Sequence, residues 1–230
     1  MPQHSAIITG ASRGIGLGLV RALADKGFSV IATARDPNAS DGLQELVSGG
    51  LVEAHTLDVD DPVSINALAK AVKDQPIRLL IHNAAILKGQ EDLAAFDTSD
   101  FLSSMRTNVV GPVLLTRALL SNLKAAGNAT ILHVSSQMGS VEGNSSAGDY
   151  PYRASKAAMN MVSKGLANEL RDYGVVSVAM HPGRVKTELG GKEAPLLPDV
   201  AAREMIETTL GLTLDHTGSF IQRSGEVIPY

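Results

Sequence analysis

The sequence predicts an α/β fold of the doubly wound (Rossmann) type, a parallel sheet with helices on both of its faces. Short β-type runs alternate with longer helical patterns along the chain, and this alternation favours parallel strands joined by right-handed crossovers. A length of 230 residues suits one α/β domain. We therefore expect residues 1–230 to form a single domain around one core.

The predicted strands are short apolar runs rich in Ile, Val, Leu and Ala. In chain order they cover residues 6–9, 28–33, 51–57, 78–82, 130–135 and 175–180. In a doubly wound fold, ligands bind beyond the carboxyl ends of the strands. The residues that follow each run are therefore the first candidates for a functional site.

The predicted helices lie between these runs, where Leu, Val, Ala and Ile recur at helical spacing. In chain order they cover residues 16–26, 41–47, 62–73, 99–126 and 152–172. Pro151 stands just before the last of them, and proline is compatible with the first turn of a helix.

Composition and charge exclude several classes of protein. Hydrophobic residues make up 44% of the chain and charged residues 19%, which supports a packed interior and argues against disorder. The formal net charge of −4 provides no basic field that would concentrate the protein on nucleic acid or on an anionic membrane. We expect neither as a partner.

Cysteine usage and the apolar runs indicate the compartment. The chain has no cysteine, which excludes disulfides, thiolate catalysis and a zinc site built on sulfur. The first residues lack the pattern of an export signal. Residues 109–120 form an apolar run that is too short to span a bilayer and is interrupted by Pro112 and Arg117. We expect a soluble, cytoplasmic protein.

A glycine-rich segment follows the first predicted strand and reads Thr-Gly-Ala-Ser-Arg-Gly-Ile-Gly over residues 9–16. Its glycines permit a tight turn, and the next helix begins at once, so that a phosphate group can sit on the helix N-terminus. Glycine clusters also occur in plain turns. The position directly after the first strand favours a nucleotide site.

The spacing T-G-x-x-x-G-I-G resembles that of the short-chain dehydrogenase/reductase family and differs from the G-x-G-x-x-G of other dinucleotide folds. The resemblance extends over nearly the whole chain. It implies a nicotinamide cofactor held by residues that follow the predicted strands and by the catalytic helix: Gly10, Ser12, Arg13, Gly14, Ile15, Gly16, Arg35, Asp58, Val59, Asn83, Ala84, Ala85, Tyr152, Lys156, Pro182, Gly183, Val185 and Thr187.

Three parts of that set match family elements. Asp58 and Val59 resemble the adenine contact, and residues 83–85 resemble the N-A-G segment, with Ala85 in place of glycine. Residues 182–187 match the P-G-x-x-x-T element, which the resemblance places near the nicotinamide amide and the phosphates. Within the family, residues 181–191 and the ending Ile-Pro-Tyr are similar to the sniffer and C-factor group of NADPH-type carbonyl reductases.

The same resemblance fills four catalytic positions. Ser136 belongs to an S-x-x-G element that ends at Gly139, and Tyr152 with Lys156 forms Y-x-x-x-K. Asn108 falls where the family places its helix asparagine, which implies that it holds a water linking Lys156 to solvent.

The chemistry of Tyr152 and Lys156 also follows from their spacing. Residues four apart on a helix project from the same face, so a phenol and an ammonium can converge on one ligand. A nearby cation favours the phenolate, and we expect it to lower the Tyr152 pKa from about 10, with a smaller contribution from the helix dipole. Tyr152 would donate a proton to a carbonyl oxygen that Ser136 also hydrogen-bonds, while the nicotinamide delivers hydride to the carbon.

Taken singly, each catalytic candidate has an ordinary alternative role, as a turn residue, a polar helix residue or an exposed pair. Ser135 is a rival for Ser136, but only Ser136 precedes a glycine by three positions. Tyr150 is a rival for Tyr152, but the residue four positions after it is Ala154. The histidines show no paired ligand spacing, and we expect no metal site.

Cofactor choice depends on the end of the second predicted strand. A preference for NAD usually needs an acid that binds the ribose 2′-hydroxyl, and Ala34 stands where that acid is expected. Arg35 and Arg13 provide two guanidinium groups for a 2′-phosphate. We predict NADPH rather than NADH. The alternative is that Arg35 is merely solvated and Asp36 binds the ribose.

The sequence indicates the identity of the substrate less clearly than that of the cofactor. The walls of the substrate site are expected from residues 86–91, 138–148 and 188–199, of which 188–199 is the main substrate loop. Glycines in the last two segments are compatible with a lid that moves and equally with plain turns. We predict a small-molecule ketone, aldehyde or quinone. The alternative function is that of a cofactor-binding regulatory or signalling protein with little turnover. Small and apolar residues in 99–126 and 152–172 favour a homodimer or homotetramer.

Overall fold

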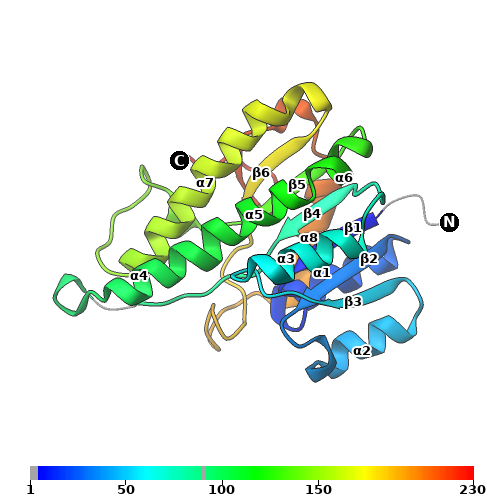
Figure 1. The fold of residues 1–230 in the computed structure, drawn as a ribbon. Helices are drawn as coiled ribbons and strands as arrows, with labels where there is room; N and C mark the ends of the chain where they lie inside the picture. The colour runs from blue at the N-terminus through cyan, green and yellow to red at the C-terminus, as the bar shows by residue number, and fades with distance from the viewer. Residues whose placement is uncertain (1–4, 90–91) are drawn as a thin grey trace.

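The computed structural model describes residues 5–89 and 92–230. Its centre is a seven-stranded parallel sheet with the strand order β3-β2-β1-β4-β5-β6-β7 (Figure 1). The strands are β1 (Ser5–Thr9), β2 (Ser29–Ala34), β3 (Val52–Thr56), β4 (Leu79–His82), β5 (Thr130–Val134), β6 (Val176–His181) and β7 (Phe220–Gln222). The strand order reverses between β1 and β4, which is the point where a doubly wound sheet binds its ligands.

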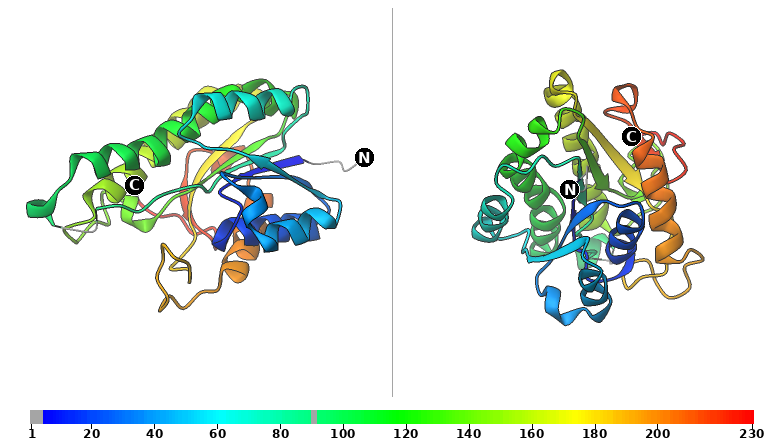
Figure 2. Two further views of the ribbon diagram at one scale, coloured as in Figure 1. Left: turned by 60° about the horizontal axis from the view of Figure 1, so that its bottom comes forward. Right: turned by 90° about the vertical axis from the view of Figure 1, so that its right-hand side faces the viewer.

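Helices cover both faces of the sheet (Figure 2). Helices α1, α2 and α8 pack on one face, and α3, α5, α6 and α7 pack on the other. Their bounds are α1 (Gly14–Asp25), α2 (Asp41–Ser48), α3 (Pro62–Ala71), α4 (Thr98–Met105), α5 (Gly111–Ala118), α6 (Leu120–Ala125), α7 (Tyr150–Leu170) and α8 (Pro198–Leu210). Within the described residues, none of these helices has the length and apolarity needed to cross a bilayer. The predicted doubly wound fold is confirmed.

The strands are apolar on both sides because each side meets a helical layer. In β1, Ala6 and Ile8 belong to the core under α1 and α8, whereas Ile7 belongs to the core under α3 and α5. All three side chains are fully buried. This two-sided burial explains why the strands are continuous apolar runs in the sequence.

Two elements near the C-terminus were not predicted. Helix α8 begins at Pro198 and therefore includes Pro198 and Asp199, although the whole segment 188–199 was expected to be a loop. Proline in the first helical turn and an acid beside it are typical helix starts. Strand β7 has only 3 residues and adds to the edge of the sheet beside β6.

The predicted helix 99–126 is wrong as a continuous element. The structure divides it into α4, a π-helical turn (Arg106–Val110), α5 and α6. Pro112 has no N–H to give to the carbonyl of Asn108, so a regular α-helix cannot run through this point. The π-helical turn therefore sits at the position of the predicted functional asparagine.

Two buried histidines lie between the sheet and helices α5 and α7. The rings of His82 and His133 stack with their centroids 5.1 Å apart. His82 Nε2 lies 2.9 Å from Thr116 Oγ1, and His133 Nε2 lies 3.3 Å from Ser177 Oγ. Burial lowers the pKa of His82 to about 3 and that of His133 well below its usual value. Both rings are therefore neutral at physiological pH.

This histidine pair makes the fold sensitive to acid. The unfolded chain takes up protons on these rings below about pH 6.5, whereas the folded chain does not, so stability falls as the pH drops. The expected slope is up to ~1.4 kcal/mol per pH unit for each histidine. Urea unfolding at a series of pH values measures it. His82→Gln should reduce the slope, and an unchanged slope in that variant would contradict the assignment.

Candidate active site

The glycine-rich segment forms a tight turn between β1 and α1. Gly10 has a φ of 68°, and a Cβ there would lie 2.9 Å from the Cα of Ala84. A Cβ on Gly16 would lie only 2.1 Å from the carbonyl oxygen of Gly10. The N-cap of α1, Arg13, makes no side-chain capping hydrogen bond. The first N–H groups of α1 are thus left for a ligand, and a phosphate suits them.

Asn83 ties the ends of β1 and β4 together at the switch point. Its Nδ2 atom donates to the carbonyls of Thr9 at 2.9 Å and Gly10 at 3.0 Å. The Thr9 hydroxyl in turn accepts from the backbone N–H groups of Asn83 and Ala84, at 3.0 Å each. These hydrogen bonds fix the conformation of the glycine-rich turn. The role of Thr9 was not predicted, although its place at the end of the first strand is a signal for it.

The loop after β3 is held against the π-helical turn. Asp58 Oδ1 accepts from Asp60 N at 2.9 Å, and Thr107 Oγ1 donates to Asp60 Oδ2 at 2.8 Å. Val59 is buried, and a Cβ on Gly111 would lie 2.6 Å from its carbonyl oxygen. Asp58 and Val59 therefore lie at the carboxyl edge of the sheet, as expected.

Ser136 and Tyr152 are brought together by β5 and α7. Ser136 follows β5 and accepts a hydrogen bond from Met138 N at 3.1 Å. Its side chain lies close enough to Tyr152 to lower the pKa of that phenol. Tyr152 itself is 5% exposed. The alternative residues for the two catalytic roles do not join this pair. Ser135 Oγ donates to Asn160 Oδ1 at 2.6 Å in the core, and Tyr150 is 37% exposed.

Lys156 lies one turn along α7 from Tyr152. Its Nζ donates to the carbonyl of Val134 at 2.8 Å and lies 5.5 Å from the centroid of the Tyr152 ring. A Cβ on Gly139 would lie 2.8 Å from the Cβ of Lys156. The glycine of the S-x-x-G element is therefore what lets the loop after β5 pack against this helix.

The prediction that Lys156 lowers the pKa of Tyr152 is wrong in this structure. Burial raises the pKa of Tyr152 to about 12, and the nearby Ser136 side chain opposes this rise. Burial also lowers the pKa of Lys156 to about 8. In a dry environment both charged forms are disfavoured, and this outweighs the attraction of the ammonium for a phenolate. The proton therefore stays on Tyr152 at neutral pH.

Asn108 lies in the π-helical turn and is 2% exposed. Its Oδ1 accepts from Ile86 N at 2.9 Å, while Nδ2 donates to Ile86 O and Ser155 Oγ, also at 2.9 Å. The Ser155 hydroxyl donates to the carbonyl of Tyr152 at 2.7 Å. Asn108 thus links the loop after β4 to the first turns of α7. Ser155 was not predicted, and only its place between the two motif residues could have suggested it.

The segment after β6 folds back over the glycine-rich turn. Gly183 has a φ of 87°, which favours glycine, and follows Pro182 directly. Val185 pairs with Leu196 in an isolated parallel bridge. A Cβ on Gly14 would lie 3.2 Å from Thr187 Cγ2. The P-G-x-x-x-T element therefore reaches the start of α1.

The two arginines expected at a 2′-phosphate have different surroundings. Arg13 Nη2 lies 2.8 Å from Glu188 Oε2, a contact that was not predicted. Arg35 is exposed at the end of β2. Asp36 Oδ1 accepts from Asn38 N at 3.1 Å, so this carboxylate caps the turn that follows it.

The remaining predicted residues lie on the same edge. Ser12 accepts a hydrogen bond from Ser40 Oγ at 2.6 Å through its carbonyl, and Ile15 is partly buried against the core under α1. Ala85 is partly buried after β4. Of the expected substrate walls, residues 90 and 91 lie outside the described residues. The wall 138–148 is tied to the C-terminal residues by Ser140 Oγ, which donates to Pro229 O at 2.7 Å.

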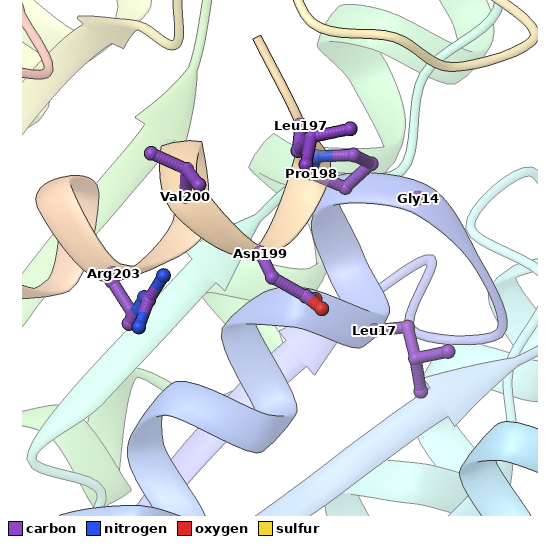
Figure 3. Close-up of a pocket in the computed structure, with 7 residues that line it drawn as sticks. All are labelled: Gly14, Leu17, Leu197, Pro198, Asp199, Val200 and Arg203. Atoms are coloured by element: carbon purple, nitrogen blue, oxygen red, sulfur yellow. The ribbon is translucent and has the colours of Figure 1, made fainter.

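A pocket of about 440 Å³ lies between the N-terminal ends of α1 and α8 (Figure 3). It is lined by Gly14, Leu17, Leu197, Pro198, Asp199, Val200 and Arg203. It adjoins the glycine-rich turn at Gly14, but Ser136, Tyr152 and Lys156 are not among its lining residues. We therefore place the reacting groups outside this pocket.

Comparisons with known proteins agree with this geometry. A family model described as short chain dehydrogenase matches residues 4–195. The chain is 35% identical over 166 residues to C-signal of Myxococcus xanthus, which is 72% of this chain and 100% of that protein. It is 28% identical to 1-hydroxy-2-glutathionyl-2-methyl-3-butene dehydrogenase of Rhodococcus sp. (strain AD45), over 99% of this chain and 100% of that one.

Solved structures of carbonyl reductases have the same fold. Carbonyl reductase Sniffer of D. melanogaster matches with a TM-score of 0.95 at 30% identity and covers 99% of both chains. An NADPH-bound carbonyl reductase from chicken fatty liver matches with a TM-score of 0.93 at 32% identity over 100% of both chains. A carbonyl reductase of Pseudomonas aeruginosa PAO1 in complex with NADP matches with a TM-score of 0.88 at 33% identity.

Proposed function

This chain belongs to the short-chain dehydrogenase family, and from that premise we propose that it is an NADPH-dependent reductase that converts a ketone, aldehyde or quinone to its alcohol. The observation that carries the proposal is the juxtaposition of the Ser136 and Tyr152 side chains, with the Lys156 ammonium 5.5 Å from the centre of the Tyr152 ring. The pair lies at the carboxyl edge of the sheet, with Lys156 one helical turn away. The glycine-rich turn lies at the same edge after β1, and β4 separates β1 from β5.

The residues at the switch point fit a dinucleotide. Gly10 and Gly16 leave no space for a Cβ, which allows the backbone to approach a ligand closely, and the start of α1 has no side-chain cap. Residues from the other strand ends, including Asp58, Asn83 and Thr187, lie along the same edge. When bound there, NADPH supplies the hydride for reduction.

The proton is assigned to Tyr152 and the orientation of the substrate to Ser136. A pKa of about 12 keeps Tyr152 protonated at neutral pH, so the group is ready to donate. The Ser136 hydroxyl has one O–H group, and it donates this hydrogen bond to the carbonyl oxygen as negative charge develops on it. Serine therefore orients the substrate and does not attack it.

Lys156 and Asn108 support that proton transfer. The Lys156 ammonium is buried against Val134 O and stabilises the negative charge that remains on Tyr152 after donation. Asn108 fixes the first turns of α7 through Ser155, and we propose that it also holds the water that reconnects Lys156 to solvent. By this account Asn108 positions the site and does not touch the reacting carbonyl.

The charges at the end of β2 support NADPH. Ala34 leaves no acid at the ribose position, and Asp36 is engaged as a cap. Arg35 and Arg13 supply the positive charge for a 2′-phosphate. The NADP in the related structures named above agrees with this preference.

Turnover with the two cofactors tests the preference. We expect kcat/KM with NADPH to exceed that with NADH by roughly 10- to 100-fold, the value of one or two charge-assisted hydrogen bonds. A panel of ketones, aldehydes and quinones provides the substrates, and absorbance of the reduced nicotinamide provides the readout. Equal use of NADH would contradict the assignment of Arg13 and Arg35.

Exposed apolar side chains favour association into a homodimer or homotetramer, which stays a prediction. Leu102 on α4, Val110 and Val113 near α5, and Met161 on α7 are 37% to 71% exposed. Such side chains on neighbouring helices are the kind that symmetric helix packing buries.

A second candidate function is that of a cofactor-binding regulatory protein with little turnover. The identity with C-signal is the observation that favours it. Such a protein needs the glycine-rich turn but not the pair of Ser136 and Tyr152, and the panel described above separates the two functions: a chain that binds NADPH and reduces nothing would support the regulatory role.

A further inference from the structure

Glu188 places a carboxylate beside an arginine that is proposed to bind phosphate. Its Oε2 atom lies 2.8 Å from Nη2 of Arg13. Arg13 is the N-cap of α1, whereas Glu188 lies in the segment between β6 and α8. The ion pair therefore joins two segments, distant in sequence, that are both proposed to hold the cofactor.

The backbone around Glu188 is fixed in a compact turn. Thr187 accepts hydrogen bonds from Gly191 N through its carbonyl and from Gly190 N through its hydroxyl, both at 2.9 Å. Lys186 N donates to Leu196 O at 2.7 Å and closes the base of the turn. The close approach of Thr187 to Gly14 seats this turn on the start of α1. Glu188 is therefore presented to Arg13 by the fold.

We infer that Glu188 lowers the discrimination between NADPH and NADH by competing with the 2′-phosphate for Arg13. The inference rests on the proposed NADPH function. The N–H groups along one edge of a guanidinium can hold a single bidentate anion at a time. A phosphate monoester carries about −1.5 to −2 charges near neutral pH, more than a carboxylate, and so displaces it. A cofactor without the 2′-phosphate leaves the ion pair in place.

The effect on affinity is small, because both side chains are 76% exposed. Exposed ion pairs of this kind change an equilibrium by about two- to fivefold. Glu188 thus makes NADPH binding weaker by about that factor than Arg13 alone would allow. NADH binding does not require the pair to break and is unaffected.

Titration calorimetry with NADPH and with NADH tests this inference. Glu188→Gln should tighten NADPH binding about two- to fivefold and leave the Kd for NADH unchanged. Glu193→Gln is the matched control, because it removes the same charge from the same exposed segment and, among the described residues, Glu193 forms no ion pair. It should leave both Kd values unchanged.

The Arg13→Ala background separates competition from a general charge effect. In that background, Glu188→Gln should no longer change NADPH affinity, since the arginine for which the two anions compete is gone. Equal tightening for both cofactors, or the same tightening in Glu193→Gln, would overturn the inference. Failure of the wild type to bind NADPH at all would instead overturn the proposed function, so the two failures are distinguishable.

Discussion

Tyr152→Phe is expected to lower kcat for carbonyl reduction by about a hundredfold to ten-thousandfold, the usual contribution of a positioned general acid. The substitution keeps the buried ring and removes only the hydroxyl, which is the proposed proton donor. NADPH binding should change by no more than a few fold, because the glycine-rich turn and the arginines are untouched. Steady-state kinetics and calorimetry measure the two effects separately.

Tyr150→Phe is the matched control for that substitution. It removes the same atom two residues earlier on the same helix, from a side chain that is 37% exposed. Its kcat should equal that of the wild type. A Tyr152→Phe enzyme that retains wild-type turnover would contradict the role of the phenol, and loss of turnover in both variants would point to damage to α7 instead.

Lys156→Met should abolish most reduction, by at least about a hundredfold, because it removes the charge that stabilises the Tyr152 phenolate after proton donation. The pH dependence of the wild-type reduction rate should also report the role of the Lys156 charge. Reduction should decline as the pH rises through about 8, where Lys156 loses its proton. Lys164→Met is the control, since Lys164 is exposed on the same helix.

The stability of Lys156→Met distinguishes chemistry from unfolding. In the folded chain the Lys156 pKa is about 8, below its usual value of 10.5, so burial of the charge costs stability below pH 8. That cost, about 3 kcal/mol, is relieved as the pH rises from 8 to 10.5. Methionine avoids it but leaves the Val134 carbonyl without its donor, which costs about 1–3 kcal/mol.

We therefore expect the free energy of unfolding of Lys156→Met at neutral pH to stay within about 1–2 kcal/mol of the wild type. Above pH 8 the wild type should gain stability relative to the variant, because only the wild type carries the buried lysine. Urea unfolding at neutral and alkaline pH measures both. A variant that is both inactive and strongly destabilised at neutral pH would contradict this account of Lys156. Its loss of activity would then be explained by unfolding and not by loss of the charge.

The sequence predicted the sheet well because strands buried on both faces are continuous apolar runs. It did not predict β7, whose 3 residues are too few to show a period. Helix α8 did carry a signal: its buried positions Ala201, Ala202, Met205, Ile206 and Thr209 recur at helical spacing after Pro198. The prediction assigned residues 188–199 to the substrate loop and no element to residues 200–210, where this spacing lies.

The positions of the site residues could be predicted from sequence spacing, but the predicted direction of the Tyr152 pKa shift was wrong. Spacing along a helix places Tyr152 and Lys156 on one face, but it does not report burial, and burial decides both pKa values. The contact between Arg13 and Glu188 depends on how the segment after β6 folds back, which no local pattern records. The oligomeric state and the cytoplasmic location stay predictions.

The most direct test of the account is a crystal structure of the complete ternary complex with NADP and a carbonyl substrate or its alcohol product. We expect the substrate oxygen to lie within hydrogen-bonding distance of both the Tyr152 hydroxyl and Ser136 Oγ, with the nicotinamide ring against its carbon. A substrate bound with its oxygen away from both hydroxyl groups, or a nicotinamide ring turned away from this edge of the sheet, would contradict it.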